Sequence, residues 1–216
     1  MPEDVPAVGA AAGPVVLPTP ETEDLGRYLE DTITIDWQTP AVMEQAQALL
    51  ADRSEPEDRV RALFEFVRDE VEHSIDFPAK KATCRASEVL RERTGLCYAK
   101  SHLLAAFLRF AGFPTGFCYV RLVSDDVPGR YTLHGFCGVY WASTGDWIFL
   151  DPRGNNEAVA TECRLEAPWS LAFEPDIERG EAFLPLIYKR PSKRIIDLLE
   201  RAPDFEAVLR NLPDAI

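Results

Sequence analysis

The spacing of apolar residues divides the chain into a first half with helical periodicity and a second half with strand periodicity. Residues 57–71 place four apolar side chains at the i, i+3, i+4 and i+7 positions of an amphipathic helix: Val60, Leu63, Phe64 and Val67. The same reasoning predicts helices over 41–52 and 86–93. A strongly apolar helix is expected within the stretch "RTGLCYAKSHLLAAFLRFAG", residues 93–112.

Two local patterns precede these helices. Residues 31–37, "DTITIDW", alternate Ile33, Ile35 and Trp37 on one face, which predicts a half-buried strand. Ser54, followed three residues later by Glu57, predicts a capping box at the start of the helix over 57–71.

From residue 116 onward, aromatic and β-branched residues dominate. The segments "GFCYVRLV", "YTLHGFCGVYW" and "WIFLD" are separated by turn-forming residues, and they predict three strands over 116–123, 131–141 and 147–151. A C-terminal helix is expected over 192–202, ending near Pro203. Helices followed by an antiparallel sheet predict an α+β fold.

Composition narrows the class of protein. The 216 residues suffice for one substantial domain, which we place over 25–216, after a mobile leader rich in Pro and Ala over 1–24. The formal net charge of −13 argues against nucleic acid and anionic membranes as partners, since both favour a basic surface. Five scattered cysteines, an odd number, favour a reducing compartment, and we expect a cytoplasmic protein.

Cys97 stands at the start of the apolar helix. If Thr94 caps that helix, Cys97 lies in the first turn, where the helix N-terminus favours a thiolate. The alternatives are a small buried core residue or a metal ligand. No Cys-x-x-Cys pair exists, and His134 and Cys137 would lie on opposite faces of their strand, so the sequence does not favour zinc.

A nucleophilic cysteine needs a general base, and the chain has three histidines. His102 lies five residues after Cys97, about 140° around the helix at 3.6 residues per turn, so we expect it in the core. His73 follows a helix and is expected to cap or pack. His134 lies on a predicted strand beside Phe136, and it is either a core residue or the base.

Asp151 ends the apolar strand "WIFLD" and could orient His134 or simply begin a turn. A hairpin centred on Thr144 would place Gly154 opposite His134. Asp151 would then be offset by three residues, about 10 Å along the strand. A hydrogen bond between the two side chains therefore requires a bulge or a shifted turn.

The motifs "HSIDF", "ASEVL", "GLCYAKSHLLAAFLRFAGFPTGFCYVRL", "LHGF" and "DPRGN" resemble a bacterial subgroup of the transglutaminase-like superfamily. The resemblance implies a papain-like core in which a helix delivers the nucleophile to a sheet that carries His and Asp. It also implies a catalytic triad of Cys97, His134 and Asp151. Where many members have Asp-Pro-Thr, this chain has Asp-Pro-Arg, which leaves the substrate preference of better-known members in question.

The expected chemistry is acyl transfer from an amide or isopeptide carbonyl through a thioester on Cys97. We expect a hydrolase acting on a peptide, a protein or a small amide. The alternatives are an amine-transferring transglutaminase, an arylamine acetyltransferase and a non-catalytic peptide- or protein-binding module. The backbone N–H of Cys97 should stabilise the oxyanion, and the candidate side-chain donors are Trp37, Gln38, His73 and Ser87. No calcium-binding loop is present in the sequence, and no metal or other cofactor is expected.

Overall fold

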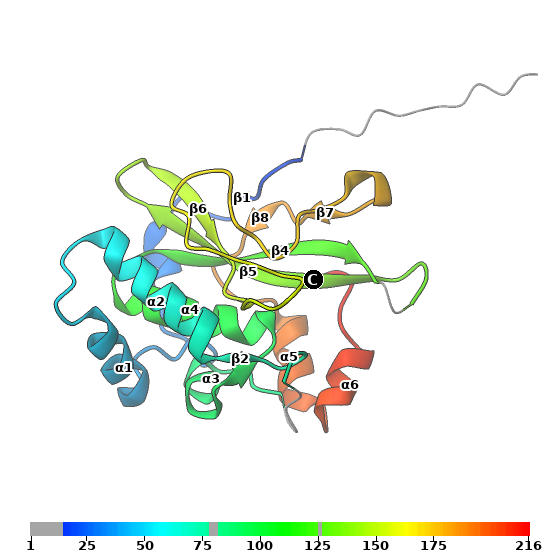
Figure 1. The fold of residues 1–216 in the computed structure, drawn as a ribbon, viewed down its shortest axis with the longest axis horizontal. Helices are drawn as coiled ribbons and strands as arrows, with labels where there is room; N and C mark the ends of the chain where they lie inside the picture. Colours follow the sequence, from blue (N-terminus) through cyan, green and yellow to red (C-terminus); the bar gives the residue numbers. More distant parts are fainter. Residues whose placement is uncertain (1–14, 78–81, 125–126) are drawn as a thin grey trace, which may run out of the picture.

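The computed structural model describes residues 15–77, 82–124 and 127–216, and Figure 1 shows their arrangement. Helices of the first half lie together on one side of an antiparallel sheet formed by the second half. The predicted α+β class is confirmed. Residues 1–14 of the predicted leader lie outside the described residues, while Thr19–Pro20 (β1) pair in parallel with Leu186–Ile187 (β8) and so belong to the folded part.

Four helices precede the sheet: α1 (Pro40–Leu50), α2 (Pro56–Glu70), α3 (Ala86–Glu92) and α4 (Cys97–Phe110). Proline occupies the first turn of both α1 and α2, where its missing N–H costs nothing. The predicted capping box of α2 is wrong. Glu55 is the N-cap, and the Ser54 hydroxyl donates to the Glu55 carboxylate instead of bonding the helix backbone.

Helix α4 is the central element of the core, because every residue from Cys97 to Arg109 is buried. Its two buried basic side chains are satisfied by backbone carbonyls. Arg109 donates to the carbonyls of Glu30, Thr115 and Lys189, and Lys100 donates to those of Arg68 and Val71. A helix surrounded by protein on all sides reads as apolar all round, which is the pattern of its sequence.

The main sheet has the strand order β6-β5-β4-β7 and is antiparallel throughout. Its strands are β4 (Thr115–Val123), β5 (Tyr131–Trp141), β6 (Asp146–Leu150) and β7 (Ala182–Phe183). The larger core cluster lies between this sheet and the helices. A smaller cluster, which includes Phe136, Phe149 and Ile187, lies separately from it.

The remaining elements are short. They are η1 (Leu25–Tyr28), β2 (Glu72–His73), β3 (Thr94–Gly95), η2 (Ile177–Arg179), α5 (Lys193–Arg201) and α6 (Phe205–Arg210). Helix α5 matches the predicted C-terminal helix. Helix α6 was not expected, and it begins because Asp204 accepts a hydrogen bond of 2.7 Å from the backbone N–H of Ala207.

The strand predicted over 31–37 is wrong: this segment is a chain of turns. The Thr32 hydroxyl accepts from the backbone N–H of Ile35, and the Thr32 N–H donates to the Ile35 carbonyl. This local pairing replaces a strand ladder. As a result Ile35 is fully buried while Ile33 is 73% exposed, so the alternating residues do not share one environment.

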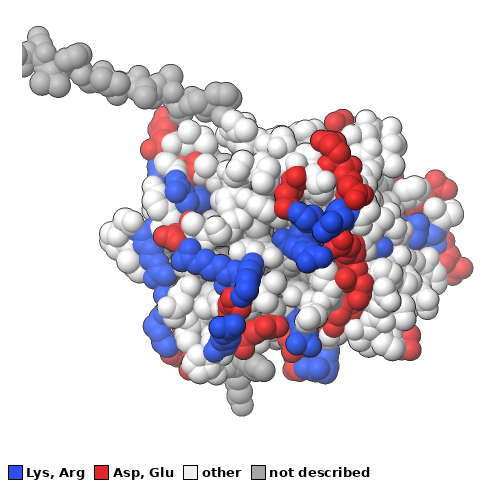
Figure 2. Space-filling view, turned by 180° about the vertical axis from the view of Figure 1, so that it is seen from behind, with Lys and Arg blue, Asp and Glu red and all other residues white. Residues whose placement is uncertain are grey.

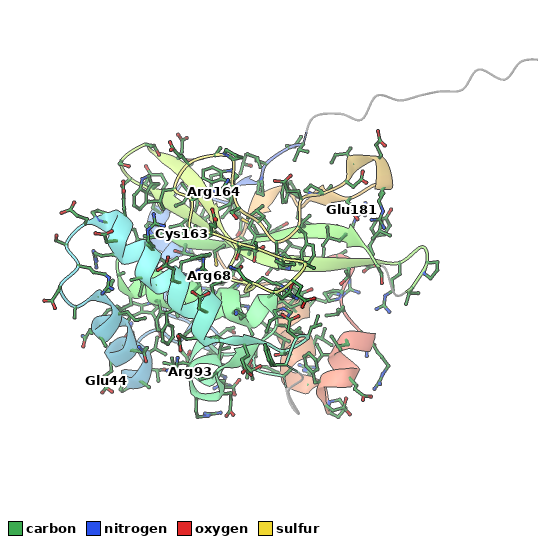
Figure 3. All side chains as sticks on the ribbon, viewed as in Figure 1. Glu44, Arg68, Arg93, Cys163, Arg164 and Glu181 are labelled. Atoms are coloured by element: carbon green, nitrogen blue, oxygen red, sulfur yellow. The ribbon has the colours of Figure 1, made fainter. Side chains whose placement is uncertain are left out.

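A long loop after β6 crosses over α2 on its way to β7 (Figure 3). It is fastened there by two arginines of α2. Arg68 donates to the Thr161 carbonyl at 3.0 Å, and Arg61 donates to the Cys163 carbonyl at 3.4 Å. The fastened loop returns toward the start of β5 at residues 171–173, which matters for the site below.

Charged side chains of opposite sign lie beside one another on the face shown in Figure 2. Surface pairs such as Arg190 with Glu30, at 2.8 Å, illustrate the arrangement. Among the described residues, none of the helices combines the length and apolar character needed to cross a membrane.

Candidate active site

Cys97 is the first residue of α4, and the short strand β3 delivers it there. Strand β3 pairs in parallel with β2, with His73 opposite Gly95. The N-cap is Leu96, and Thr94 lies in β3, so the expected capping role of Thr94 is wrong. The expected position of Cys97 in the first turn is confirmed. Its backbone N–H has no acceptor within the helix and is free to meet a ligand.

His134 lies on β5 at the point where the sheet loses a strand. Strand β6 pairs with β5 only from Cys137 to Trp141, so at His134 strand β6 is no longer a neighbour, and the N–H of the adjacent residue Leu133 donates to the Pro213 carbonyl at 2.9 Å instead. Leu150 is opposite Cys137, and continuing this register by one residue places Asp151 opposite Phe136. The side chains of His134 and Asp151 thus lie on the same face, two residues apart.

This register corrects the expected hairpin by one residue. The turn occupies residues 142–145 between Trp141 and Asp146, and Gly145 takes a positive φ of 76° within it. Shifting the register by one residue moves the side chains of a strand to the other face of the sheet. The offset between His134 and Asp151 therefore changes from three residues to two, and both side chains lie on the same face. Diagonal neighbours at this spacing are within reach of long side chains. The shifted turn that the sequence required is present.

Asp151 is fully buried and accepts three hydrogen bonds. Its Oδ2 accepts from Nε2 of His134 at 2.8 Å and from the backbone N–H of Ala172 at 2.9 Å. Its Oδ1 accepts from the backbone N–H of Arg153 at 3.1 Å. The carboxylate is thereby fixed in place, and Nδ1 is the ring nitrogen of His134 left for other partners.

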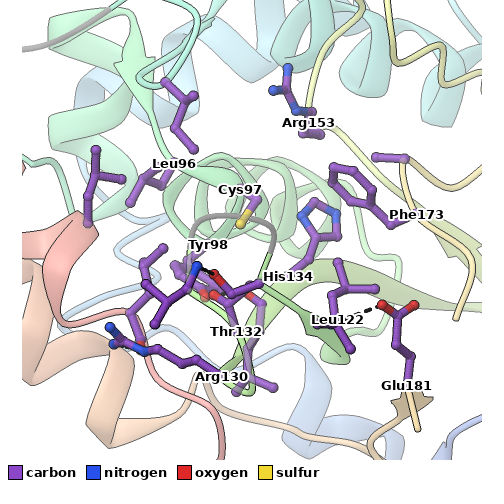
Figure 4. A pocket seen from close by; sticks show the side chains of 18 of the residues that line it. Leu96, Cys97, Tyr98, Leu122, Arg130, Thr132, His134, Arg153, Phe173 and Glu181 are labelled. Atoms are coloured by element: carbon purple, nitrogen blue, oxygen red, sulfur yellow. Dashed lines mark hydrogen bonds between the residues drawn. The ribbon is translucent and has the colours of Figure 1, made fainter. Parts of the chain in front are cut away.

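Figure 4 shows the Cys97 side chain next to the imidazole ring of His134, and a hydrogen bond between these two side chains is among the interactions that raise the pKa of His134. The two side chains and Asp151 come from α4, β5 and the end of β6, and the structure brings all three together. On the opposite side, Phe173 contacts the His134 ring edge-on, with the ring centroids 5.0 Å apart. The imidazole is therefore held by Asp151 and Phe173 and also contacts Cys97.

Electrostatics favour the protonated form of His134. Burial lowers the pKa of His134, but the charge of Asp151, the charge of Cys97 and hydrogen bonds to both together raise it to about 10. Burial raises the pKa of Asp151, but His134 and the two backbone N–H groups outweigh burial and hold this pKa below its usual value. The carboxylate and the imidazolium stabilise one another.

Gly135 allows α4 to approach β5 at this point. A Cβ atom on Gly135 would lie 2.8 Å from Cδ1 of Tyr98, closer than side chains pack. The Tyr98 hydroxyl in turn donates a short hydrogen bond to the Leu133 carbonyl. Residues next to Cys97 and His134 therefore bind each other, which fixes the start of α4 against β5.

A polar frame holds the two loops behind the site. Arg153 forms a bidentate ion pair with Asp76, and Asn156 donates to the same carboxylate at 3.1 Å. Asp76 follows β2, so the loop after Asp151 is tied to the segment that carries His73. Arg153 lines the site, and Asn155 builds the loop by accepting from the backbone N–H of Thr161.

The three side chains Cys97, His134 and Arg153 line a cavity of about 1080 Å³, which Figure 4 shows from close by. Much of the remaining wall is apolar and comes from the β4–β5 hairpin and the C-terminal segment: Leu122, Val127, Leu133, Leu209 and Leu212. Phe173 and Ile75 also line the cavity and are 37% and 50% exposed. The wall also includes charged side chains, among them Arg130, Glu181 and Arg210.

Of the four side chains named as candidate oxyanion donors, His73 lines this cavity. The other three proposed oxyanion donors do not line it. Trp37 donates its indole N–H to the Leu29 carbonyl, Ser87 donates to Asp36, and Gln38 is exposed elsewhere. Of the other titratable residues singled out in the sequence, His102 is buried in the core as expected, with Nδ1 donating to the Cys84 carbonyl at 2.7 Å.

The other four cysteines lie in surroundings that differ from those of Cys97. Cys118 and Cys137 are fully buried, as expected of small residues in the sheet. Burial raises the pKa of Cys84 and Cys137 to about 12 and of Cys163 to about 11. Within the described ranges, no group of three His, Cys, Asp or Glu side chains could hold a metal ion.

A model of the transglutaminase-like superfamily matches residues 44–152, which include α2, α4, β4, β5 and Asp151. The chain belongs to this superfamily. The resemblance inferred from the sequence motifs is therefore confirmed, and the matched region contains all three of the residues Cys97, His134 and Asp151. No curated protein matches the chain.

Several solved structures are similar to part of this chain. A "Putative Cysteine Protease" from Cytophaga hutchinsonii is 18% identical, with a TM-score of 0.49, and the match covers 61% of this chain and 43% of that one. The periplasmic domain of TgpA from Pseudomonas aeruginosa is 21% identical, with a TM-score of 0.44, covering 59% and 46%. Red sea bream transglutaminase is 14% identical, with a TM-score of 0.37, covering 61% and 26%. The chain thus matches less than half the length of each.

Proposed function

We propose that this protein is a cysteine-dependent hydrolase of amide or isopeptide bonds, with Cys97 as nucleophile, His134 as acid and base, and Asp151 orienting His134. The observation that carries the proposal is the alignment of the three groups. Cys97 is hydrogen-bonded to the ring of His134, whose Nε2 donates at 2.8 Å to a fully buried Asp151. A thiolate beside an imidazolium is the reactive state of a cysteine nucleophile.

The reaction follows from these positions. The Cys97 thiolate forms a bond to the carbonyl carbon, and the C=O electron pair moves to oxygen, which becomes an oxyanion. When the carbonyl reforms, the C–N bond breaks and His134 gives its proton to the leaving amine. The thioester on Cys97 is then attacked by water, with neutral His134 accepting the water proton. Collapse of this second intermediate releases the acid and restores the thiolate.

The cavity supports a substrate of peptide dimensions with a bulky apolar side chain near the reacting carbonyl. Cys97 shares the cavity with apolar side chains, among them Ile75 and Phe173, which are 50% and 37% exposed. We further place the protein in the cytoplasm, supported by five cysteines that are all free and buried.

Selective alkylation tests the nucleophile. Iodoacetamide at pH 7.5, followed by peptide mass mapping, should label Cys97 faster than the other four cysteines, and His134→Ala should slow this labelling. Cys163 is the matched control, because its exposure of 6% is close to the 7% of Cys97 while it lacks a histidine partner. Labelling of Cys163 as fast as Cys97 would contradict the proposal.

Turnover distinguishes the reaction types. A panel of peptidyl aminomethylcoumarin amides with apolar or charged side chains should show Cys97-dependent release of the fluorophore, fastest with apolar residues. Cys97→Ala should abolish release and Cys163→Ala should not. Incorporation of dansylcadaverine into a glutamine peptide, in place of hydrolysis, would select the transglutaminase alternative. Binding of peptides without either reaction would select the non-catalytic module.

A further inference from the structure

The backbone N–H of Cys97 supplies one donor for the oxyanion formed in the proposed reaction, and a second donor is needed from a side chain. Such a donor must line the cavity, carry a proton at neutral pH and have no other acceptor. Among the candidates raised by the sequence, only His73 lines the cavity with Cys97.

The backbone places His73 next to the nucleophile. Strand β2 ends at His73, which lies opposite Gly95 in β3, two residues before Cys97. The Ser74 N–H donates to the Gly95 carbonyl at 3.1 Å and fixes this register. The side chain is only 5% exposed, so its position is determined by packing.

Hydrogen bonding determines which nitrogen of His73 carries the proton. The backbone N–H of Ile75 approaches Nδ1 at 3.4 Å, and because an N–H can only donate, Nδ1 accepts. The proton of the neutral ring is then on Nε2. Within the described residues, Nε2 of His73 has no hydrogen-bond partner.

The ring is also kept neutral. Burial lowers the pKa of His73 to about 3, and the nearby cations Arg153 and Lys100 lower it in the same direction, outweighing the opposite effect of Asp76. The Asp76 carboxylate, 4.0 Å from Nδ1, is itself paired with Arg153. A neutral imidazole donates a hydrogen bond to an oxyanion without giving up its proton.

We propose that the Nε2–H of His73 is the side-chain oxyanion donor of this site and acts together with the backbone N–H of Cys97. This assignment rests on the proposed acyl-transfer function. It gives the two buried histidines of the cavity different roles: His134 exchanges protons with the reacting groups, and His73 keeps its proton and stabilises charge.

Two small reagents separate this role from a general effect on the thiolate. Alkylation of Cys97 by iodoacetamide forms no oxyanion, whereas acetylation by p-nitrophenyl acetate passes through one. The full-length variants His73→Gln and His73→Met are a matched pair, because the two side chains have similar length and only Gln has N–H donors. Rates are followed by mass spectrometry of Cys97 and by nitrophenolate release, with Cys97→Ala as background.

In His73→Met, acetylation should fall about 10²–10³-fold relative to the wild type, while alkylation stays within about twofold. His73→Gln should recover a large part of the acetylation rate. Equal loss of both reactions in His73→Met would overturn the assignment, as would no loss of either. Failure of wild-type Cys97 to react preferentially with either reagent would instead overturn the proposed function.

A measurement on the wild type covers the case in which His73→Met does not fold. With ¹⁵N-labelled histidine, the Nε2–H signal of His73 should move downfield when 1,1,1-trifluoroacetone forms an anionic adduct on Cys97. Iodoacetamide modification of the same cysteine should leave this signal close to its original position. An Nε2–H signal that does not respond to the ketone adduct would refute the assignment.

Discussion

Acidification should destabilise the native protein through His102, which lies in the core of α4 with 1% exposure. Its Nδ1 donates to the Cys84 carbonyl, and its ring contacts Phe117 edge-on at 5.6 Å. Burial lowers the pKa of His102 from 6.5 to about 4; the Cys84 hydrogen bond opposes this shift and the charge of Arg109 adds to it. The unfolded chain therefore binds a proton at pH 5.5 that the native protein does not.

The size of the effect follows from linkage. A pH of 5.5 is one unit below the pKa of His102 in the unfolded chain, 6.5, and above its pKa of about 4 in the native protein. Proton binding therefore stabilises the unfolded state by about 1.4 kcal/mol relative to the native state. This pH also lies above the sequence pI of about 4.7, where the protein keeps a net negative charge. At pH 7.5 His102 is neutral in both states and contributes nothing.

Other histidines titrate in the same range, so a variant is needed to isolate His102. His73, with a pKa near 3, should add a loss of the same sign. His134 has the opposite sign: its raised pKa gives stability that is fully present below pH 6.5 and is lost as the pH rises toward 10. His102→Asn keeps a donor for the Cys84 carbonyl and does not titrate.

The assay is urea unfolding of the wild type and His102→Asn at pH 7.5 and 5.5, followed by tryptophan fluorescence. On acidification, the free energy of unfolding of the wild type should fall by about 1.4 kcal/mol more than that of the variant. Between pH 7.5 and 8.5 the two proteins should change in parallel. Equal losses at pH 5.5 would refute the conclusion that His102 is neutral in the native state.

Three further predictions concern the frame of the site. Asp151→Asn should lower amide hydrolysis on the order of 10²–10⁴-fold, because the buried charge that holds His134 protonated is lost; progress curves with the best coumarin substrate measure it. Gly135→Ala should cost about 1–3 kcal/mol in urea unfolding, since the new methyl group meets Tyr98 at 2.8 Å, and unchanged stability would show that α4 can shift without cost. Lys100→Met should lower the free energy of unfolding by about 2–4 kcal/mol because two carbonyls at the end of α2 lose their donor, whereas the exposed Lys193→Met should have little effect.

Strong periodicity made most of the fold predictable from the sequence. The apolar pattern of α2 and the aromatic, β-branched run of β5 gave their bounds to within a residue. The segment over 31–37 failed because a threonine hydroxyl paired locally with the backbone, and alternation of side chains carries no information about that competition.

The residues of the candidate site could be proposed from the sequence, but their geometry could be predicted only in part. Cys97, His134 and Asp151 followed from motifs, but the offset between His134 and Asp151 depends on where a four-residue turn is centred, and an error of one residue exchanges the faces. The place of His73 depends on a parallel pairing between β2 and β3. Two-residue strands leave no periodic signal, so nothing in the sequence pattern placed His73 beside the nucleophile.

The loop after β6 limits where the length of the chain near the site can change. The backbone N–H groups of Arg153 and Ala172 bind the two oxygens of the same Asp151 carboxylate, so the loop is closed at its base by the residue that orients His134. Between these two anchors the loop is also held to α2 at Thr161 and Cys163, and both of these residues are buried, so its course is fixed at more than its base. The exposed residues 166–168 lie outside these fixed points, so changes of loop length there should leave the Asp151 carboxylate and its two backbone donors in place.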